Sequence, residues 1–190
     1  SRVMYRRTIA ERVQALAPFL QYDKDPYLVI RDDGSLVWMW DAYTSTDRFP
    51  YSQPRADGTN YVRNPIKVVI NAYDGRVTFY QIDPDDPLAN AGGKVFEGLF
   101  TPGDQMPDDI RRHMRYPEDL YSVQAEALTI YHMTDPQIFY NKEDAWEIPT
   151  EVYASEQIPV VPYYETLALP GSTDPEFALL FAHRVLMRFN

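Results

Sequence analysis

The first apolar positions of the chain recur at helical spacing, between residues 8 and 20. They lie three or four positions apart, which places them on one stripe of an α-helix. The stripe consists of Ile9, Val13 and Leu16. Thr8 and Glu11 have the spacing of a capping box, in which each side chain binds the backbone N–H of the other residue. Pro18 is expected to end this helix because it lacks an N–H group.

Two later segments, 26–43 and 64–83, each contain two apolar runs separated by Asp-Gly. This dipeptide favours tight hairpin turns, so Asp33-Gly34 and Asp74-Gly75 predict two β-hairpins with two-residue loops. Such a loop in the second hairpin would direct one set of side chains toward the core. The set consists of Ile66, Val68, Ile70, Ala72, Val77 and Phe79.

The first hairpin carries an aromatic group that could be either core or a ligand platform. A two-residue loop would place Trp38 opposite Val29 and Trp40 opposite Tyr27, all on one face. The other face would then hold Leu28, Ile30, Val37 and Met39. Because both faces are apolar, we expect the strand pair to be covered on both sides, with Trp38 and Trp40 mostly buried. Among the tryptophans, Trp146 is the one expected to be exposed.

The alternative for the same aromatic group is that flat rings stack on a sugar. Tyr27, Trp38 and Trp40 are therefore the candidate ligand-binding residues. They would form an aromatic shelf on one face of the first hairpin.

The pattern changes to helical after Asp83. Three helices are predicted: a short one opening at Asp86-Pro87, another over 107–114, and a longer one over 117–132. Apolar runs over 160–170 and 176–183 predict a last strand pair. The fold class is therefore α+β: an antiparallel sheet of about six strands built from hairpins, with helices inserted mainly in the middle of the chain.

The stretch YHMTDPQ places a histidine beside residues with oxygen-bearing side chains. His132 falls in the last turn of the predicted long helix, where its imidazole can meet free carbonyls. Thr134 and Gln137 have the spacing of a capping box for a following short helix. We interpret His132 as structural rather than catalytic or metal-binding.

The charge of the chain bears on its partners. The net charge is −10, which argues against nucleic acid, whose binding requires a concentrated basic surface. Two small basic groups are interpreted as solvated helix faces: Arg2, Arg6, Arg7 and Arg12, and Arg111, Arg112 and Arg115. The sequence contains no run of about 18 apolar residues, so the chain itself is not expected to insert into a membrane. It also contains no cysteine, which excludes disulfides.

A search for reactive groups leaves the catalytic residues unknown. The three histidines are far apart, and none has a second ligand three or four residues away, so no metal site and no cofactor are expected. The acidic stretches 23–26 and 83–87 are interpreted as turn chemistry rather than calcium sites. With 28 acidic residues, abundance alone cannot identify a pair of catalytic carboxylates.

Four long segments together resemble the bacterial uncharacterised protein family 0182. They are WDAYTSTDRFPYSQ, NYVRNPIKVVINAYDGRVTFYQIDPDDP, RYPEDLYSVQAEALTIYHMTDPQIFYNKEDAWEIP and PYYETLALPG. The similarity covers roughly Tyr27 to Leu180; after Leu180 the sequence departs from the family pattern. The resemblance implies a multi-pass cell-membrane protein in which several spanning helices precede a large water-soluble region. It supplies no reaction, substrate or catalytic residue.

We therefore expect residues 1–190 to be a single soluble domain, excised from such a larger membrane protein and facing the extracytoplasmic side. The expected function is non-enzymatic binding, with the rest of its own chain, an envelope component or another protein as partner. Two alternatives remain open. One is a carboxylate-dependent hydrolase acting on envelope glycans, which requires converging acids in a cleft. The other is a structural cap on the membrane portion.

Overall fold

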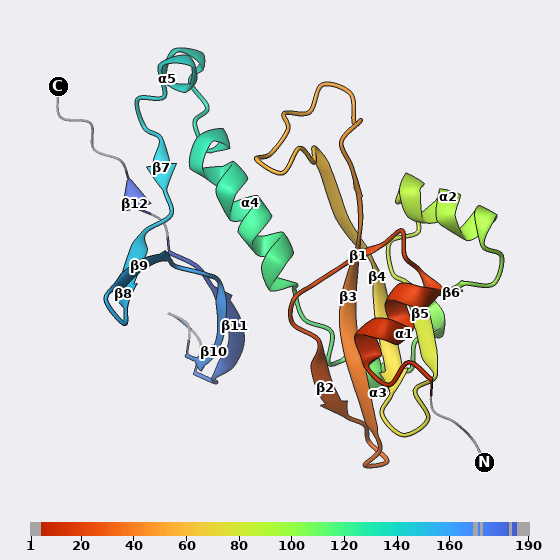
Figure 1. Ribbon diagram of the computed structural model, residues 1–190. Helices are drawn as coiled ribbons and strands as arrows, with labels where there is room; N and C mark the ends of the chain where they lie inside the picture. Colours follow the sequence, from red (N-terminus) through yellow and green to blue (C-terminus); the bar gives the residue numbers. More distant parts are fainter. Residues whose placement is uncertain (1–4, 169–170, 172, 183, 186–190) are drawn as a thin grey trace. The chain divides into compact units, whose positions relative to one another are not determined.

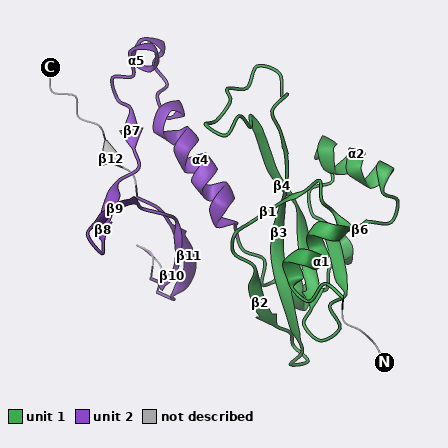
Figure 2. Cartoon of the chain, in the orientation of Figure 1, with its two compact units in different colours: residues 1–115 green, residues 116–190 purple. Residues whose placement is uncertain are grey.

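The computed structural model describes residues 5–168, 171, 173–182 and 184–185. The chain forms two compact units, which divide between Arg115 and Tyr116 (Figure 2). The prediction of a single domain stays a prediction. None of the helices in the described ranges combines the length and the apolar character needed to cross a bilayer.

Unit 1 contains one mixed sheet and the helices that pack on it (Figure 1). Its helical elements are α1 (Ile9–Leu16), α2 (Pro87–Val95), the 3₁₀ turn η1 (Gly103–Gln105) and α3 (Asp108–Arg111). Its strands are β1 (Gln21–Tyr22), β2 (Tyr27–Ile30), β3 (Leu36–Thr46), β4 (Tyr61–Asn71), β5 (Val77–Gln81) and β6 (Phe100–Pro102).

The six strands follow the order β1-β3-β4-β5-β6, with β2 also paired to β3. The pairs are antiparallel except for β5 and β6, which run parallel. The two long central strands, β3 and β4, have 11 residues each and carry most of the buried positions. Helices and a largely antiparallel sheet confirm the predicted α+β class.

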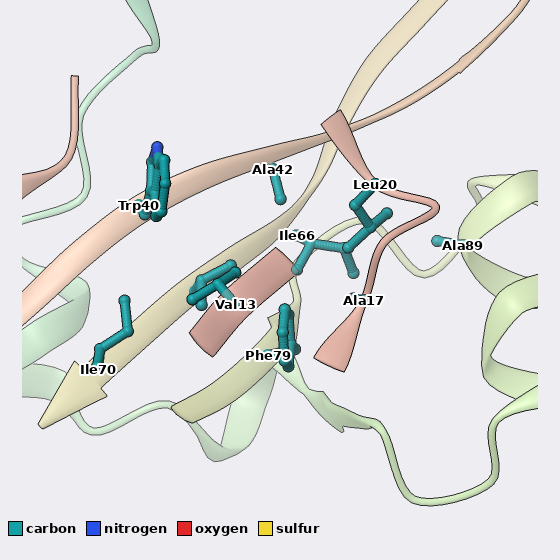
Figure 3. Close-up of a cluster of buried hydrophobic side chains, with 10 residues drawn as sticks. Val13, Ala17, Leu20, Trp40, Ala42, Ile66, Ile70, Phe79 and Ala89 are labelled. Atoms are coloured by element: carbon teal, nitrogen blue, oxygen red, sulfur yellow. The ribbon is translucent and has the colours of Figure 1, made fainter. Parts of the chain in front are cut away.

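One face of the sheet packs on α1 and α2 around Phe79, which is almost fully buried. Figure 3 shows Val13 and Ala17 in this cluster, together with side chains from β3, β4 and β5. The helix begins as predicted, because the Thr8 and Glu11 side chains each bind the other residue's backbone N–H at 3.2 Å. The capping box therefore fixes where α1 begins, and Val13 of this helix packs on the sheet.

The second hairpin has a longer loop than predicted. Asn71 N donates to Arg76 O, so four residues separate the strands instead of two. Ile70 therefore pairs with Val77, and Val68 pairs with Phe79. Since the register differs from the prediction by two residues, each side chain keeps its face, and the predicted core set lies in one cluster apart from Ala72.

The first hairpin is also longer than predicted, and here the prediction is wrong. Arg31 N donates to Ser35 O around a three-residue loop, with Gly34 at φ 80°. Trp38 therefore lies opposite Leu28 and not Val29, while Tyr27 lies opposite Met39 and not Trp40.

This one-residue difference moves Tyr27 to the other side of the sheet from Trp38 and Trp40. Tyr27 joins a second cluster, which packs on η1 and α3. The buried members are Val29, Val37, Met39, Val69, Met106 and Ile110. The two sides of β3 are thus covered, but Leu28 and Ile30 of β2 are 46% and 65% exposed, so the prediction of cover on both sides is wrong for β2.

The three tryptophans differ less in exposure than predicted. Trp40 is buried and Trp38 is half-buried. Trp146 is also half-buried rather than exposed, because its ring stacks on His132 with centroids 3.8 Å apart. The expectation for Trp146 is therefore wrong.

Unit 2 is built from short elements. They are α4 (Glu118–Tyr131), α5 (Pro136–Asn141), β7 (Trp146–Glu147), β8 (Thr150–Tyr153), β9 (Glu156–Pro159), β10 (Tyr163–Leu167), β11 (Glu176–Leu180) and β12 (Arg184–Val185). Their strands form separate pairs, including the predicted last pair, β10 with β11. The N-cap of α5 is Asp135, whose carboxylate accepts from Gln137 N and Ile138 N. The predicted cap, Thr134, was wrong by one residue.

Gly103 allows η1 to approach the backbone of β5, and its replacement gives a first prediction. A Cβ at this position would lie 2.6 Å from Gln81 O and 2.9 Å from Ile82 Cα. Because backbone atoms cannot move aside easily, Gly103→Ala is expected to lower the free energy of unfolding by about 1–3 kcal/mol. Urea denaturation measures this change.

The matched control is Gly93→Ala in α2, where the nearest described atom is the flexible side chain of Phe100 at 3.3 Å. Alanine also favours the helix by about 1 kcal/mol over glycine. Equal losses for the two variants would contradict the close-approach explanation for Gly103.

Candidate functional site

Unit 1 has a groove at the end of β5, beneath α2 and beside η1 and α3. Its volume is about 720 Å³. It is lined by Gln81, Ile82, Pro84, Asn90, Phe100, Pro102, Gly103, Asp104, Arg111 and Met114. This size suits a small molecule or a few side chains of a partner.

Apolar side chains form much of the groove wall, and two amides sit between them. Gln81 Nε2 donates to Asn90 Oδ1 at 2.9 Å and to Asp83 O at 3.0 Å. Asn90 Nδ2 in turn donates to Pro84 O at 2.8 Å. These bonds fix both amides, so the groove has a preformed polar strip rather than mobile side chains.

Arg111 provides the positive charge of the groove. Its Nη2 donates to Gly103 O, which anchors the guanidinium at the wall. Within the described residues no carboxylate forms an ion pair with Arg111, and several of its N–H groups have no described acceptor. Because a guanidinium carries five donors, Arg111 can bind a carboxylate or another acceptor while keeping its anchor.

The acids of the groove do not form a catalytic pair. Asp104 is the one carboxylate in the lining, and glycoside hydrolysis by the common mechanisms requires two facing carboxyl groups.

The acids that do converge lie elsewhere in unit 1, inside the protein. Asp23 and Asp41 are 4% and 2% exposed and influence each other electrostatically. Lys67, also buried, pairs with Asp41 and donates to Arg115 O at 3.1 Å. Tyr43 donates its hydroxyl hydrogen bond to Asp23. Both carboxylates are thus occupied within the fold and line neither of the cavities described here.

Burial raises the pKa of Asp41 above the usual range of a carboxyl group, and the positive charge of Lys67 opposes that rise. Burial dominates because the pair lies between the sheet and the segments that cover it. A buried ion pair of this kind contributes little net stability, but removal of one partner is costly.

Asp-Pro segments that resembled calcium ligands are instead turns and caps. Asp23 Oδ1 accepts from Asp25 N at 2.9 Å. Asp83 Oδ1 accepts from Asp85 N, and Asp86 caps α2 by accepting from Ala89 N at 2.6 Å. In the part of the chain that the structure describes, no three His, Cys, Asp or Glu side chains gather as metal ligands would.

The sequence-predicted aromatic shelf is not assembled. Trp38 and Trp40 lie on the face of the sheet that α1 covers, and Tyr27 lies on the opposite face. The Cζ atom of Arg115 lies over the Tyr27 ring, 3.9 Å from the ring centroid. Sequence reasoning also missed the groove residues, because Gln81, Asn90 and Arg111 belong to three separate elements without a motif.

His132 has the structural role that its position predicted. Nδ1 lies 2.7 Å from Leu128 O in the last turn of α4, and Nε2 lies 2.9 Å from Asp144 O. Both ring nitrogens face carbonyl oxygens, so neither is directed at a metal. The ring joins the end of α4 to the segment that carries Trp146.

Lys67 provides a prediction about pH. Lys67→Met is expected to lower the free energy of unfolding by about 3–5 kcal/mol near neutral pH, because Asp41 is left buried without a cation. Burial raises the pKa of Asp41 in the folded state, so its ionised form weakens folding as pH rises. The loss is therefore expected to be smaller at about pH 5 than at about pH 8.

Urea denaturation at both pH values measures the difference between Lys67→Met and the parent protein. The control is Lys94→Met, which removes an exposed lysine from α2 and is expected to change little. The double variant Asp41→Leu/Lys67→Met is expected to recover most of the stability. A pH-independent loss in the single variant would contradict the assigned cause.

Comparison with known proteins places the chain in a family. The model of "Uncharacterised protein family (UPF0182)" matches residues 1–190. A UPF0182 protein of Pelotomaculum thermopropionicum is 56% identical over 180 residues, which are 95% of this chain and 20% of the relative. The Nostoc protein alr1037 is 48% identical over 198 residues, covering 100% of this chain and 20% of the relative.

A relative in Methanospirillum hungatei is 50% identical over 186 residues, covering 95% of this chain and 21% of that protein. The chain thus spans about a fifth of the length of these relatives. No solved structure matches it significantly. The family resemblance of the four sequence segments is confirmed, and the chain belongs to the uncharacterised protein family UPF0182.

Proposed function

We propose that this chain is a non-enzymatic binding and interaction domain of a larger membrane protein, on its extracytoplasmic side. Unit 1 binds a ligand in its groove, and unit 2 contacts the remainder of the same polypeptide. The groove carries the first half of this proposal, because it joins apolar walls to a fixed amide strip and one anchored guanidinium.

The ligand that suits the groove has an apolar body and one acidic group. The apolar body would lie against Ile82, Phe100 and Met114, and the acid would meet Arg111. Binding is favoured over hydrolysis because the convergent acids, Asp23 and Asp41, are buried and already paired. A ligand of this chemistry is consistent with an envelope component, the partner class that the sequence suggested.

Hexanoate is a simple probe for the groove, and hexanol is its uncharged counterpart. In ¹⁵N-labelled protein, we expect hexanoate to shift the amide signals of Gln81, Asn90 and Arg111. Hexanol is expected to shift the same signals more weakly, by about tenfold in apparent affinity, because a charge-assisted hydrogen bond is lost.

Two variants identify the charge that matters. Arg111→Gln is expected to abolish the preference for hexanoate over hexanol. Asp104→Asn is expected to strengthen that preference, because it removes a negative charge that repels the carboxylate of hexanoate. Signal shifts outside the groove, or an unchanged preference in Arg111→Gln, would contradict the proposed ligand class.

The second half of the proposal depends on the small core of unit 2. Its buried apolar side chains among the described residues include Ala125, Met133 and Ala145, which are mostly small. In contrast, large apolar side chains are exposed along α4, α5 and strands β8 to β11: Leu128, Tyr131, Phe139, Tyr140, Val152, Tyr153, Ile158, Tyr163 and Phe177.

So many exposed large apolar side chains are typical of a segment that makes contacts with a partner. The relatives are about five times longer than this chain, so they offer a partner within the same polypeptide. Through this contact, unit 2 would also act as a structural cap on the membrane portion.

Hydrogen exchange tests this contact. We expect the backbone amides of β8 to β11 to exchange about tenfold or more slowly in a full-length family protein than in the 190-residue chain, because covered strands open less often. Amides of β3 and β4 in unit 1 serve as the internal control and are expected to exchange alike in both. Equal exchange of β8 to β11 in the two proteins would contradict the contact.

A further inference from the structure

A second, smaller cavity of about 140 Å³ lies beside the first turn of α1. Arg7 and Arg12 line it from the helix side, and Trp38 lines it from β3. The β4–β5 turn completes it with Asn71 and Gly75. Residues that are about 60 positions apart in the sequence thus line one recess, and two of them are arginines.

Arg12 is held in place by the turn. Its Nη1 donates to Gly75 O at 3.0 Å. A Cβ on Gly75 would lie 2.5 Å from Arg12 Cζ, so the guanidinium occupies the space that a side chain would take. Gly75 also has φ 69°, a conformation that favours glycine. The turn therefore seats Arg12 at the cavity wall and leaves its remaining donors for another acceptor.

Asn71 adds a third donor with a defined orientation. Its Oδ1 accepts from Tyr73 N at 2.8 Å and from Asp74 N at 3.0 Å. Since the amide oxygen is used by the turn, Nδ2 is the atom left for a ligand. No described residue accepts a hydrogen bond from that nitrogen.

The two arginines of this cavity differ from most others in unit 1. Six arginines each form an ion pair with an aspartate: Arg31, Arg48, Arg55, Arg76, Arg112 and Arg115. No described carboxylate pairs with Arg7 or Arg12. The neighbouring acids are engaged elsewhere, Glu11 with Thr8 N and Asp74 with Arg76.

We propose that the cavity formed by Arg7, Arg12, Asn71 and Trp38 binds a phosphate-type oxyanion. The planar forks of two guanidinium groups and one amide N–H₂ match the several acceptor oxygens of such an anion. This site is separate from the groove of unit 1 and binds a different ligand chemistry.

The charge of the whole chain limits the ligand to a single anionic group. A polyanion such as nucleic acid would be repelled by a chain of net charge −10, whereas one phosphate meets the local excess of positive charge. The phosphate can belong to a small soluble molecule or to a phospholipid headgroup, and the two sources share the same contacts.

Inorganic phosphate is the first probe, and the indole N–H signal of Trp38 is the reporter. Titration at low ionic strength is expected to shift that signal and the amide signals of Asn71 and Gly75 in a saturable way. Trp38→Phe assigns the indole signal among the three tryptophans. Chloride at equal ionic strength is the anion control, because it screens charge without offering several acceptor oxygens.

Two charge-removing variants test the contacts. Arg7→Gln and Arg12→Gln are each expected to weaken phosphate binding by about tenfold or more, since each removes a charge-assisted hydrogen bond. Arg48→Gln removes the same charge from an exposed site in another loop and is expected to change binding little. Arg7 is exposed, so Arg7→Gln is expected to leave the fold intact and tests the site even if Arg12→Gln unfolds.

A third variant tests the position of the Arg12 guanidinium against the turn without changing the charge of the chain. Gly75→Ala is expected to displace the guanidinium and to weaken phosphate binding, with the fold checked by circular dichroism. Gly34→Ala, at the turn of the other hairpin, introduces the same positive-φ strain where a Cβ would meet nothing within 4 Å. It is expected to leave phosphate binding unchanged.

Vesicles separate the two sources of phosphate. Vesicles of phosphatidylcholine with phosphatidic acid are compared with vesicles of phosphatidylcholine alone in a flotation assay. Flotation that requires phosphatidic acid and is lost in Arg7→Gln assigns a lipid headgroup. Binding of inorganic phosphate without flotation assigns a soluble ligand. The proposal is overturned if neither probe binds, or if binding persists equally in both arginine variants.

Discussion

The pairing of β3 with β4 is the constraint on which unit 1 depends. Each strand has 11 residues, and both carry apolar side chains on their two faces. Such a strand pair is stable only when both faces are covered, so α1 and α2 must pack on one side and η1 with α3 on the other. The groove and the smaller cavity both arise where these covering segments meet strand ends and turns.

The same two strands also hold the buried Asp41–Lys67 pair. The two residues are directly opposite each other in the register, which places their charges between the apolar layers. Arg115 O accepts from Lys67, and so the ion pair also ties the last residue of unit 1 to the sheet. Taking two charges out of water is expensive, and the hydrogen bonds to their neighbours offset that expense.

Unit 2 is organised by a different principle. Its short strand pairs and two helices depend on local contacts, such as Asp135 at the start of α5 and His132 at the end of α4. Among the residues of this unit that the structure describes, few large apolar side chains are buried. Unit 1, in contrast, has a buried apolar cluster on each face of its sheet.

Local chemistry in the sequence determined the elements and the fold class. The Thr8–Glu11 capping box, Asp86-Pro87 and the Asp-Gly turns all mark ends of elements that the structure contains. Loop length was not determined, because Gly34 with positive φ suits a three-residue loop as well as a two-residue turn.

Only the tertiary structure decided which residues meet. A shift of two residues left the core set of the second hairpin on its predicted face, but a shift of one moved Tyr27 away from Trp38 and Trp40. Arg12 and Gly75 meet across 63 positions, and Gln81 of β5 and Arg111 of α3 line the same groove. Side chains so far apart in the chain become neighbours only through packing, which no local pattern of residues records.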